Sequence, residues 1–237
     1  MIFQILMASA QEIGEALAQS EPVREELSVS LIGMAIKGGW IMIPLLLLSL
    51  IAIYIFGEKW WIIRKASQIN DNFMRNIKDY VHDGKVQAAL SLCDSTDSPI
   101  ARMVEKGIRR IGRPLPDIQA SIENVGNVEV ARLEKKLPIL ATIAGGAPMI
   151  GFLGTVLGMI QSFFNMAQAG NNVDITLLSG GIYVALVTTV AGLVVGILAY
   201  FGYNYLTSSI NNLVYKMESS SLEFMDMLHE PDTSKKA

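Results

Sequence analysis

The segment GFLGTVLGMIQSFF, from Gly151 to Phe164, lies inside a longer apolar stretch and has the composition of a membrane span. It nevertheless places a hydroxyl group, that of Thr155, between two glycines, Gly154 and Gly158. A helix that only crosses a bilayer needs apolar bulk, and small or polar residues contribute little to that task. These positions therefore indicate a helix that packs closely against other helices or lines a polar path.

Charge is excluded from a long region around this segment. Between Ile139 and Tyr215 there is no Lys or Arg, and the only acid is Asp174. Of the 237 residues 17% are charged, against about 25% in soluble domains. A bilayer imposes such segregation because its interior excludes charge. The predicted fold class is an all-α membrane protein with three transmembrane helices and long helical cytoplasmic extensions.

The first predicted span has clear boundaries. Lys37 and Glu58 bracket an uncharged run of about 20 residues, which is the length that crosses a bilayer core. Trp40 lies at one end and Trp60 and Trp61 at the other, as aromatic residues at membrane interfaces do. The predicted transmembrane segments are 38–63, 139–165 and 177–203, with a short polar loop at 166–176.

Basic residues predict the orientation. Of the 19 basic residues only Arg24 and Lys37 precede the first span, and none lies in the loop between the second and the third. Positively charged segments stay in the cytoplasm, so we predict a periplasmic N-terminus and a cytoplasmic C-terminus. The cytoplasmic part then comprises a helical region, 64–138, and a C-terminal helix and tail, 204–237. Cys93 is expected there in its reduced form.

The N-terminal region allows two interpretations. Ala8, Ser9 and Ala10 could end a signal peptide, but the run before them lacks a basic start and is interrupted by Gln4. The alternative, which we prefer, is an amphipathic helix that lies on the periplasmic membrane surface over residues 1–37.

Several functional classes receive no support from the sequence. The net charge is −3, which does not favour nucleic-acid binding. The two histidines, His82 and His229, are far apart and have no ligand-like neighbours, so no metal site is predicted. Nucleotide loops, nucleophile elbows and paired carboxylates are also missing, so we expect neither a cofactor nor an enzyme.

Small residues recur at helical spacing in the second and third spans. In the second span they are four, three and four residues apart, and in the third they follow the same rhythm, so each set forms a stripe on one helix face. Such stripes let membrane helices approach closely. The stripes are Ala147, Gly151, Gly154 and Gly158, and Gly181, Ala185, Thr188, Gly192 and Gly196.

The threonines beside these stripes also have two interpretations. Their hydroxyls could bond back to carbonyls of their own helices and serve packing alone. Alternatively, Thr155, Thr188 and Thr189 line a polar path for an ion, which their clustering near mid-membrane on two helices favours. The interiors of these two spans hold no carboxylate, so the chain cannot carry protons on a buried acid of its own.

Two segments resemble a known family. LPILATIAGGAPMIGFLGTVLGMIQSF (Leu137–Phe163) and GGIYVALVTTVAGLVVGILAYFGYN (Gly180–Asn204) are similar to the ExbB/TolQ/MotA proton-channel family, most of all to ExbB. The resemblance implies a homopentameric ring in the bacterial inner membrane, around an ExbD/TolR-like single-span protein that supplies a membrane Asp. It implies that Thr155 and Thr189 face the pore and that Pro148 belongs to the packing motif. It further implies that proton-motive force becomes mechanical work, which a TonB-like periplasmic protein delivers to outer-membrane transport.

One position departs from the pattern of this family. Val184 stands where ExbB-type members commonly have Glu, five residues before Thr189. MotA-type members also lack this Glu, so Val184 is kept among the predicted pore positions. The alternatives are a MotA-like stator of a rotary or gliding machine and a membrane scaffold without ion flux. The sequence leaves open whether the ion is H⁺ or Na⁺.

Overall fold

The computed structural model describes residues 39–68, 72–169 and 175–229. Regular structure in these ranges is entirely helical, which confirms the predicted all-α class. The predicted surface helix at 1–37, the centre of the 166–176 loop and the end of the C-terminal tail lie outside the described residues. The helices are α3 (Met42–Ala66), α4 (Phe73–His82), α5 (Val86–Ser95), α6 (Pro99–Ile108), α7 (Leu115–Glu134), α8 (Leu137–Ala169) and α9 (Ile175–His229).

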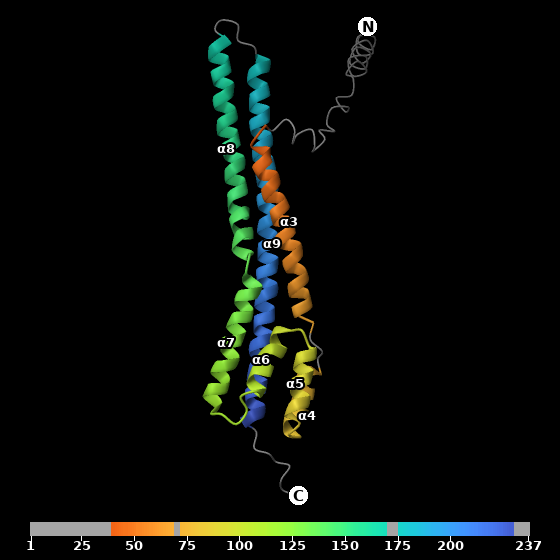
Figure 1. Cartoon of the computed structure of the whole chain (residues 1–237). Helices are drawn as coiled ribbons and strands as arrows, with labels where there is room; N and C mark the ends of the chain where they lie inside the picture. Colours follow the sequence, from red (N-terminus) through yellow and green to blue (C-terminus); the bar gives the residue numbers. More distant parts are fainter. Residues whose placement is uncertain (1–38, 69–71, 170–174, 230–237) are drawn as a thin grey trace, which may run out of the picture.

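Three long helical columns form the body of the molecule. Helix α9 runs the whole length without a break, α8 packs antiparallel against its upper half, and α3 lies beside both (Figure 1). Three helical segments of the described chain are long and apolar enough to cross a membrane: Met42–Ala66, Leu115–Gln168 and Leu178–His229. Each of them overlaps one of the three predicted spans.

The upper half of these columns exposes large apolar side chains. Leu46 and Ile53 on α3, Phe152 on α8, and Leu198 and Phe201 on α9 are all more than half exposed. An aqueous surface does not tolerate apolar exposure on this scale, whereas a bilayer or further membrane helices cover it favourably.

The lower half is a separate helical bundle. Helices α4, α6 and α7 pack against the lower part of α9, and α5 packs on α4 and α6 (Figure 1). Ile77, Val104, Ile122, Leu213 and Phe224 are almost fully buried in this bundle. The long helix α9 extends from the upper half into this bundle, so both halves are built on the same helix.

The start of α6 shows how local sequence sets this bundle. Ser98 has extended backbone geometry, and its hydroxyl accepts a hydrogen bond of 3.1 Å from the backbone N–H of Ala101. Pro99 follows at the first helical position, where its missing N–H costs nothing. The Ser-Pro pair therefore fixes where the helix begins.

The column that contains the second predicted span consists of two helices, α7 and α8, joined by two residues. Helix α7 ends at Glu134 and α8 begins at Leu137, and between them Lys136 adopts a left-handed backbone conformation with φ of 79°. A non-glycine residue rarely occupies this region, so the surrounding contacts must hold it there.

Helix α3 supplies those contacts. The buried ammonium group of Lys59 donates to the carbonyl oxygens of Arg132 at 3.1 Å and Leu133 at 2.9 Å. These carbonyls belong to the last turn of α7 and lack ordinary helical partners, so Lys59 caps the helix end. Lys136 itself pairs with the carboxylate of Glu58 at 2.7 Å. The joint is therefore pinned from the side by two adjacent residues of α3.

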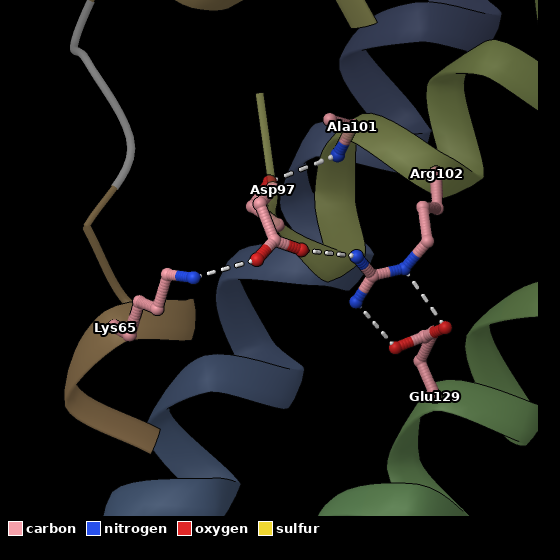
Figure 2. A network of polar contacts seen from close by, with 6 residues as sticks. Lys65, Asp97, Ala101, Arg102 and Glu129 are labelled. Carbon is pink, nitrogen blue, oxygen red and sulfur yellow. Dashed lines mark hydrogen bonds and ion pairs between the residues drawn. The ribbon is translucent and has the colours of Figure 1, made fainter. Parts of the chain in front are cut away.

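A second polar network ties α3 to the bundle (Figure 2). Lys65, in the last turn of α3, contacts Asp97 at 2.8 Å, and Asp97 also accepts a hydrogen bond of 3.0 Å from Arg102 on α6. Arg102 in turn binds both carboxylate oxygens of Glu129 on α7, at 2.9 and 2.7 Å. The hydrogen bond from Lys65, followed by that from Arg102, holds the pKa of Asp97 below its usual value. One chain of charges thus joins α3, α6 and α7.

We expect the Arg102–Glu129 pair to contribute most of the stability in this network. The Glu129 side chain is buried, so Arg102→Met leaves an unpaired carboxylate in the interior and should lower the free energy of unfolding by about 3 kcal/mol. Arg109→Met is the matched control because it removes an exposed pair with Glu105 four residues away, worth about 0.5 kcal/mol or less. Thermal unfolding of the detergent-solubilised protein, followed by helical circular dichroism, measures both. Equal losses in the two variants would contradict the assignment.

Candidate functional site

The upper halves of α8 and α9 approach each other so closely that only glycine fits at their crossing. A Cβ atom added to Gly192 would lie 2.6 Å from the carbonyl oxygen of Ala147 and 2.9 Å from the Cα of Gly151. A Cβ added to Gly151 would lie 2.8 Å from the carbonyl oxygen of Thr188. These neighbours are backbone atoms, which cannot rotate away. The glycines are therefore required by direct contact between the two backbones.

The rest of the predicted stripes lies along the same contact. Gly154 faces the side chain of Thr188, Gly158 faces Ala185, and Gly181 faces Ser162. Near the lower end, a Cβ on Gly196 would lie 2.5 Å from the ring of Pro148 and 3.0 Å from the carbonyl oxygen of Ala144. Every predicted packing position therefore belongs to one continuous seam: Pro148, Gly151, Gly154, Gly158, Gly181, Gly192 and Gly196.

Two threonine hydroxyls meet across this seam. The hydroxyl oxygens of Thr155 on α8 and Thr189 on α9 are hydrogen-bonded to each other. Thr155 also lies 3.3 Å from the carbonyl oxygen of Ala185, and Thr189 lies 3.1 Å from that of Gly151. The result is a hydrogen-bonded row of four oxygens, in the order Ala185, Thr155, Thr189, Gly151, which we call the hydroxyl row.

The hydroxyl row has fewer protons than acceptor positions. Each threonine hydroxyl donates one hydrogen, and both can accept. Either Thr155 donates to Thr189 and Thr189 to Gly151, or Thr189 donates to Thr155 and Thr155 to Ala185. The two arrangements use the same oxygens and differ only in direction. A reversible row of this kind can orient water or a passing ion without any change in the protein's own charge.

The other two predicted pore residues lie elsewhere. Thr188 is 1% exposed and fills the seam beneath Gly154. Its hydroxyl lies 2.7 Å from the carbonyl oxygen of Ala185 in its own helix and 3.4 Å from that of Gly151, so it contacts the two end carbonyls of the row but neither threonine hydroxyl. Val184 is half-buried and precedes Thr189 by five residues, which places it about 140° away round α9. Only Thr155 and Thr189 are brought together.

The surroundings of the hydroxyl row are free of charge. No side chain is charged within residues 137–169 of α8 and 175–215 of α9. In the described chain as a whole, no group of three His, Cys, Asp or Glu side chains could hold a metal ion. The hydroxyl row is thus a polar position on two helices that carry no charge nearby.

A comparison with known families gives a match that covers both helices of the seam, α8 and α9. Residues 95–219 match the MotA/TolQ/ExbB proton channel family, a range that includes α6, α7, α8 and most of α9. The chain belongs to this family. The match contains the hydroxyl row and part of the bundle core, while α3, α4 and nearly all of α5 lie outside it.

Individual proteins of the MotA/TolQ/ExbB family support the same placement. The putative biopolymer transport protein ExbB-like 1 of Synechocystis is 31% identical over 73% of this chain and 69% of its own length. A putative ExbB homologue of Methanothermobacter thermautotrophicus is 30% identical over 73% of this chain and 62% of its own length, so the match leaves over a third of that relative uncovered. The Tol-Pal system protein TolQ of Pseudomonas aeruginosa is 26% identical over 82% of this chain and 90% of its own length.

Membership of this family makes the chain a relative of proton channels, which are not a class of enzymes. Together with three membrane-capable helices, it indicates a multi-pass inner-membrane protein. The preference for ExbB over TolQ stays a prediction, because relatives of both names match.

The joint at Lys135 and Lys136 was not predicted from the sequence. Its signal was nonetheless present, since Pro138 follows at the second position of α8, and proline favours the first turn of a helix. The capping role of Lys59 had no such signal, because a lysine after an apolar run is equally typical of a simple membrane boundary.

Proposed function

We propose that this chain is the channel-forming subunit of an inner-membrane motor driven by the proton-motive force. Five copies form a ring around single-span partner helices of the ExbD/TolR type, and protons pass along the inner wall of the ring. Each charge that crosses releases about 2.3 kcal/mol per 100 mV of membrane potential. The ring passes this energy as motion to a TonB-like periplasmic protein.

The hydroxyl row is the observation that carries the proposal. Packing alone does not need it, because the backbones already meet at Gly151 and Gly192. Two hydroxyls that bridge the helices, with two equivalent hydrogen-bond directions, are suited to a surface along which protons or water move. In the assembled ring we assign Thr155 and Thr189 to the pore wall and Thr188 to helix packing.

The absence of a carboxylate from the described second and third spans favours a partner protein that supplies one. A proton path needs a group that binds and releases the proton, and residues 137–169 and 175–215 contain neutral polar groups but no carboxylate. A carboxylate on a partner helix inside the ring would supply it, as the family resemblance implies. Val184, which is apolar, cannot take this role.

The joint supports the proposed orientation. Lys59, Arg132 and Lys136 gather where α3 and α8 meet the bundle. Positive charge at one end of the spans favours the cytoplasmic side for this end, so we assign the bundle to the cytoplasm and the α8–α9 loop to the periplasm.

A Tol-Pal role is the second candidate. It is favoured by the match to Pseudomonas TolQ, which extends over 90% of that protein. The same channel chemistry would then drive a TolA-like protein in place of a TonB-like one.

Proton flux in proteoliposomes tests the proposal. The purified chain alone should give no flux, because its second and third spans hold no carboxylate in the membrane interior. Co-reconstitution with its single-span partner should give flux that a pH-sensitive dye detects under an imposed potential. Replacing the partner's membrane Asp by Asn should abolish the flux. A complex that assembles with its partner but conducts nothing under any potential would favour the scaffold. Flux from this chain alone would refute the role of the partner acid.

A further inference from the structure

Helix α7 has a groove with acidic edges along one flank. The groove lies between α7 and α9, has a volume of about 480 Å³, and its floor is formed by Met103, Val130, Met217 and other apolar residues. Glu123 of α7 and Glu218 of α9 stand at its edges, and Leu222 of α9, 64% exposed, lies among them. We call this surface the acidic groove.

The opposite flank of α7 is basic. Lys106 of α6 and Arg110, just after α6, lie beside Asn124 and Val128 of α7, and Val128 is 67% exposed. Successive helical residues are about 100° apart, so Val128 lies about 140° round α7 from Glu123 and about 160° from Val130 of the acidic groove. We call this surface the basic face.

The charges of both surfaces lack partners of opposite sign in the described part of the molecule. Glu218, Arg110 and Lys106 take part in no ion pair there, and Glu123 only accepts a hydrogen bond of 2.8 Å from Gln119. By contrast, the nearby Arg102 and Arg109 are both paired. An exposed valine between unpaired cations, and an exposed leucine between unpaired acids, are typical of surfaces that another protein covers.

We propose that the basic face of one copy binds in the acidic groove of a neighbouring copy. The two surfaces carry opposite charge and lie on opposite flanks of α7, so the contact between copies is head-to-tail. A two-fold axis would pair one surface with the same surface of the neighbour, which these charges oppose. Repeated from copy to copy in the plane of the membrane, such a contact closes into a ring when the rotation between copies matches that of the proposed ring. The inference rests on the proposed ring and adds to it the cytoplasmic surfaces that hold neighbouring copies together.

Cysteine cross-linking in the membrane tests this geometry. With Val128→Cys and Leu222→Cys in the same chain, mild oxidation should give a ladder that ends at the full ring. Each single variant should give no ladder, because a head-to-tail contact places the two different positions together and keeps equal positions apart. The native Cys93 does not interfere, since it is buried and its burial raises the thiol pKa to about 12.

Three cross-linking outcomes would overturn the proposal. Dimers from Val128→Cys alone would show a two-fold contact in its place. An absence of the ladder in the double variant, with intact oligomers by size-exclusion chromatography, would show that the ring contact lies elsewhere. Cross-linking of Leu222→Cys to the single-span partner would assign the acidic groove to that protein.

Charge exchange gives an independent test. Arg110→Glu and Glu218→Lys should each lower the yield of the cross-linked ladder, by about two- to five-fold for the loss of a surface pair, and the double exchange in one chain should restore it. Glu223→Lys is the matched control, because Glu223 is exposed and lies about 140° from Glu218 round α9. An equal loss with Glu223→Lys, or no restoration by the double exchange, would refute the pairing.

The cross-linking result is separable from the channel proposal. A ladder without proton flux would leave the interface in place and refute the channel. Flux with intact rings but without the ladder would refute the interface alone.

Discussion

Replacing Thr155 and Thr189 together by valine is expected to abolish proton flux while the oligomer still assembles. Valine has nearly the shape of threonine, so the change removes both hydroxyls of the row. The carbonyl of Ala185 then has no partner across the seam, and that of Gly151 keeps only the Thr188 hydroxyl at 3.4 Å. The cost in stability should be small, because hydrogen bonds between membrane helices contribute about 0.6 kcal/mol each on average. The close glycine contacts of the seam are untouched. Flux through the co-reconstituted complex and its elution volume are measured on the same preparation.

Two controls separate chemistry from shape. Thr155→Ser with Thr189→Ser keeps both hydroxyls and should keep most of the flux. Thr142→Val removes an exposed hydroxyl of α8 that bonds only to Pro138 in its own helix, at 2.8 Å, and should conduct normally. Normal flux in the double valine variant would remove Thr155 and Thr189 from the pore wall. Loss of assembly in that variant would assign the hydroxyls to packing.

Gly192→Ala is expected to break the seam and with it the oligomer. The added methyl group would lie 2.6 Å from a backbone carbonyl and 2.9 Å from a backbone Cα of α8, so the two helices must separate along their contact. Overpacking of this kind costs about 1–3 kcal/mol, and Gly192→Leu should cost more. The measurements are the melting temperature and the size-exclusion profile in detergent.

Gly145→Ala is the matched control for the seam. Nothing lies within 4 Å of a Cβ at Gly145, which is also a glycine of α8. Alanine is the better helix former, so this variant should be as stable as the parent or slightly more stable. If Gly192→Ala and Gly145→Ala melt alike, the helices of the membrane-embedded protein are further apart than described above.

The part of the structure that sequence reasoning recovered depends on local patterns. Charge exclusion defines three spans because a bilayer acts on every residue in turn, and the recurrence of small residues identifies one face of α8 and one of α9. Neither requires knowledge of a distant partner.

What the sequence did not reveal depends on pairs of residues far apart in the chain. Thr188 and Thr189 are adjacent and chemically identical, yet one is buried under Gly154 and the other meets Thr155, because successive residues differ by about 100° in direction. The placement of Lys59 against the end of α7 and of Arg102 against Glu129 likewise depends on tertiary packing.

Because α9 is one unbroken helix, a small tilt at one point displaces its distant end by a larger distance. Its 55 residues extend over about 80 Å, and a bilayer core takes only about 30 Å of that length. A tilt of about 5° at mid-membrane therefore displaces the far end of α9, at His229, by roughly 5 Å. Helix α9 is unbroken, whereas the neighbouring column is interrupted at the Lys135–Lys136 joint, which Glu58 and Lys59 of α3 hold in place. A tilt of α9 beside the hydroxyl row would therefore displace Phe224 and the helices packed round it by a larger distance than the row itself.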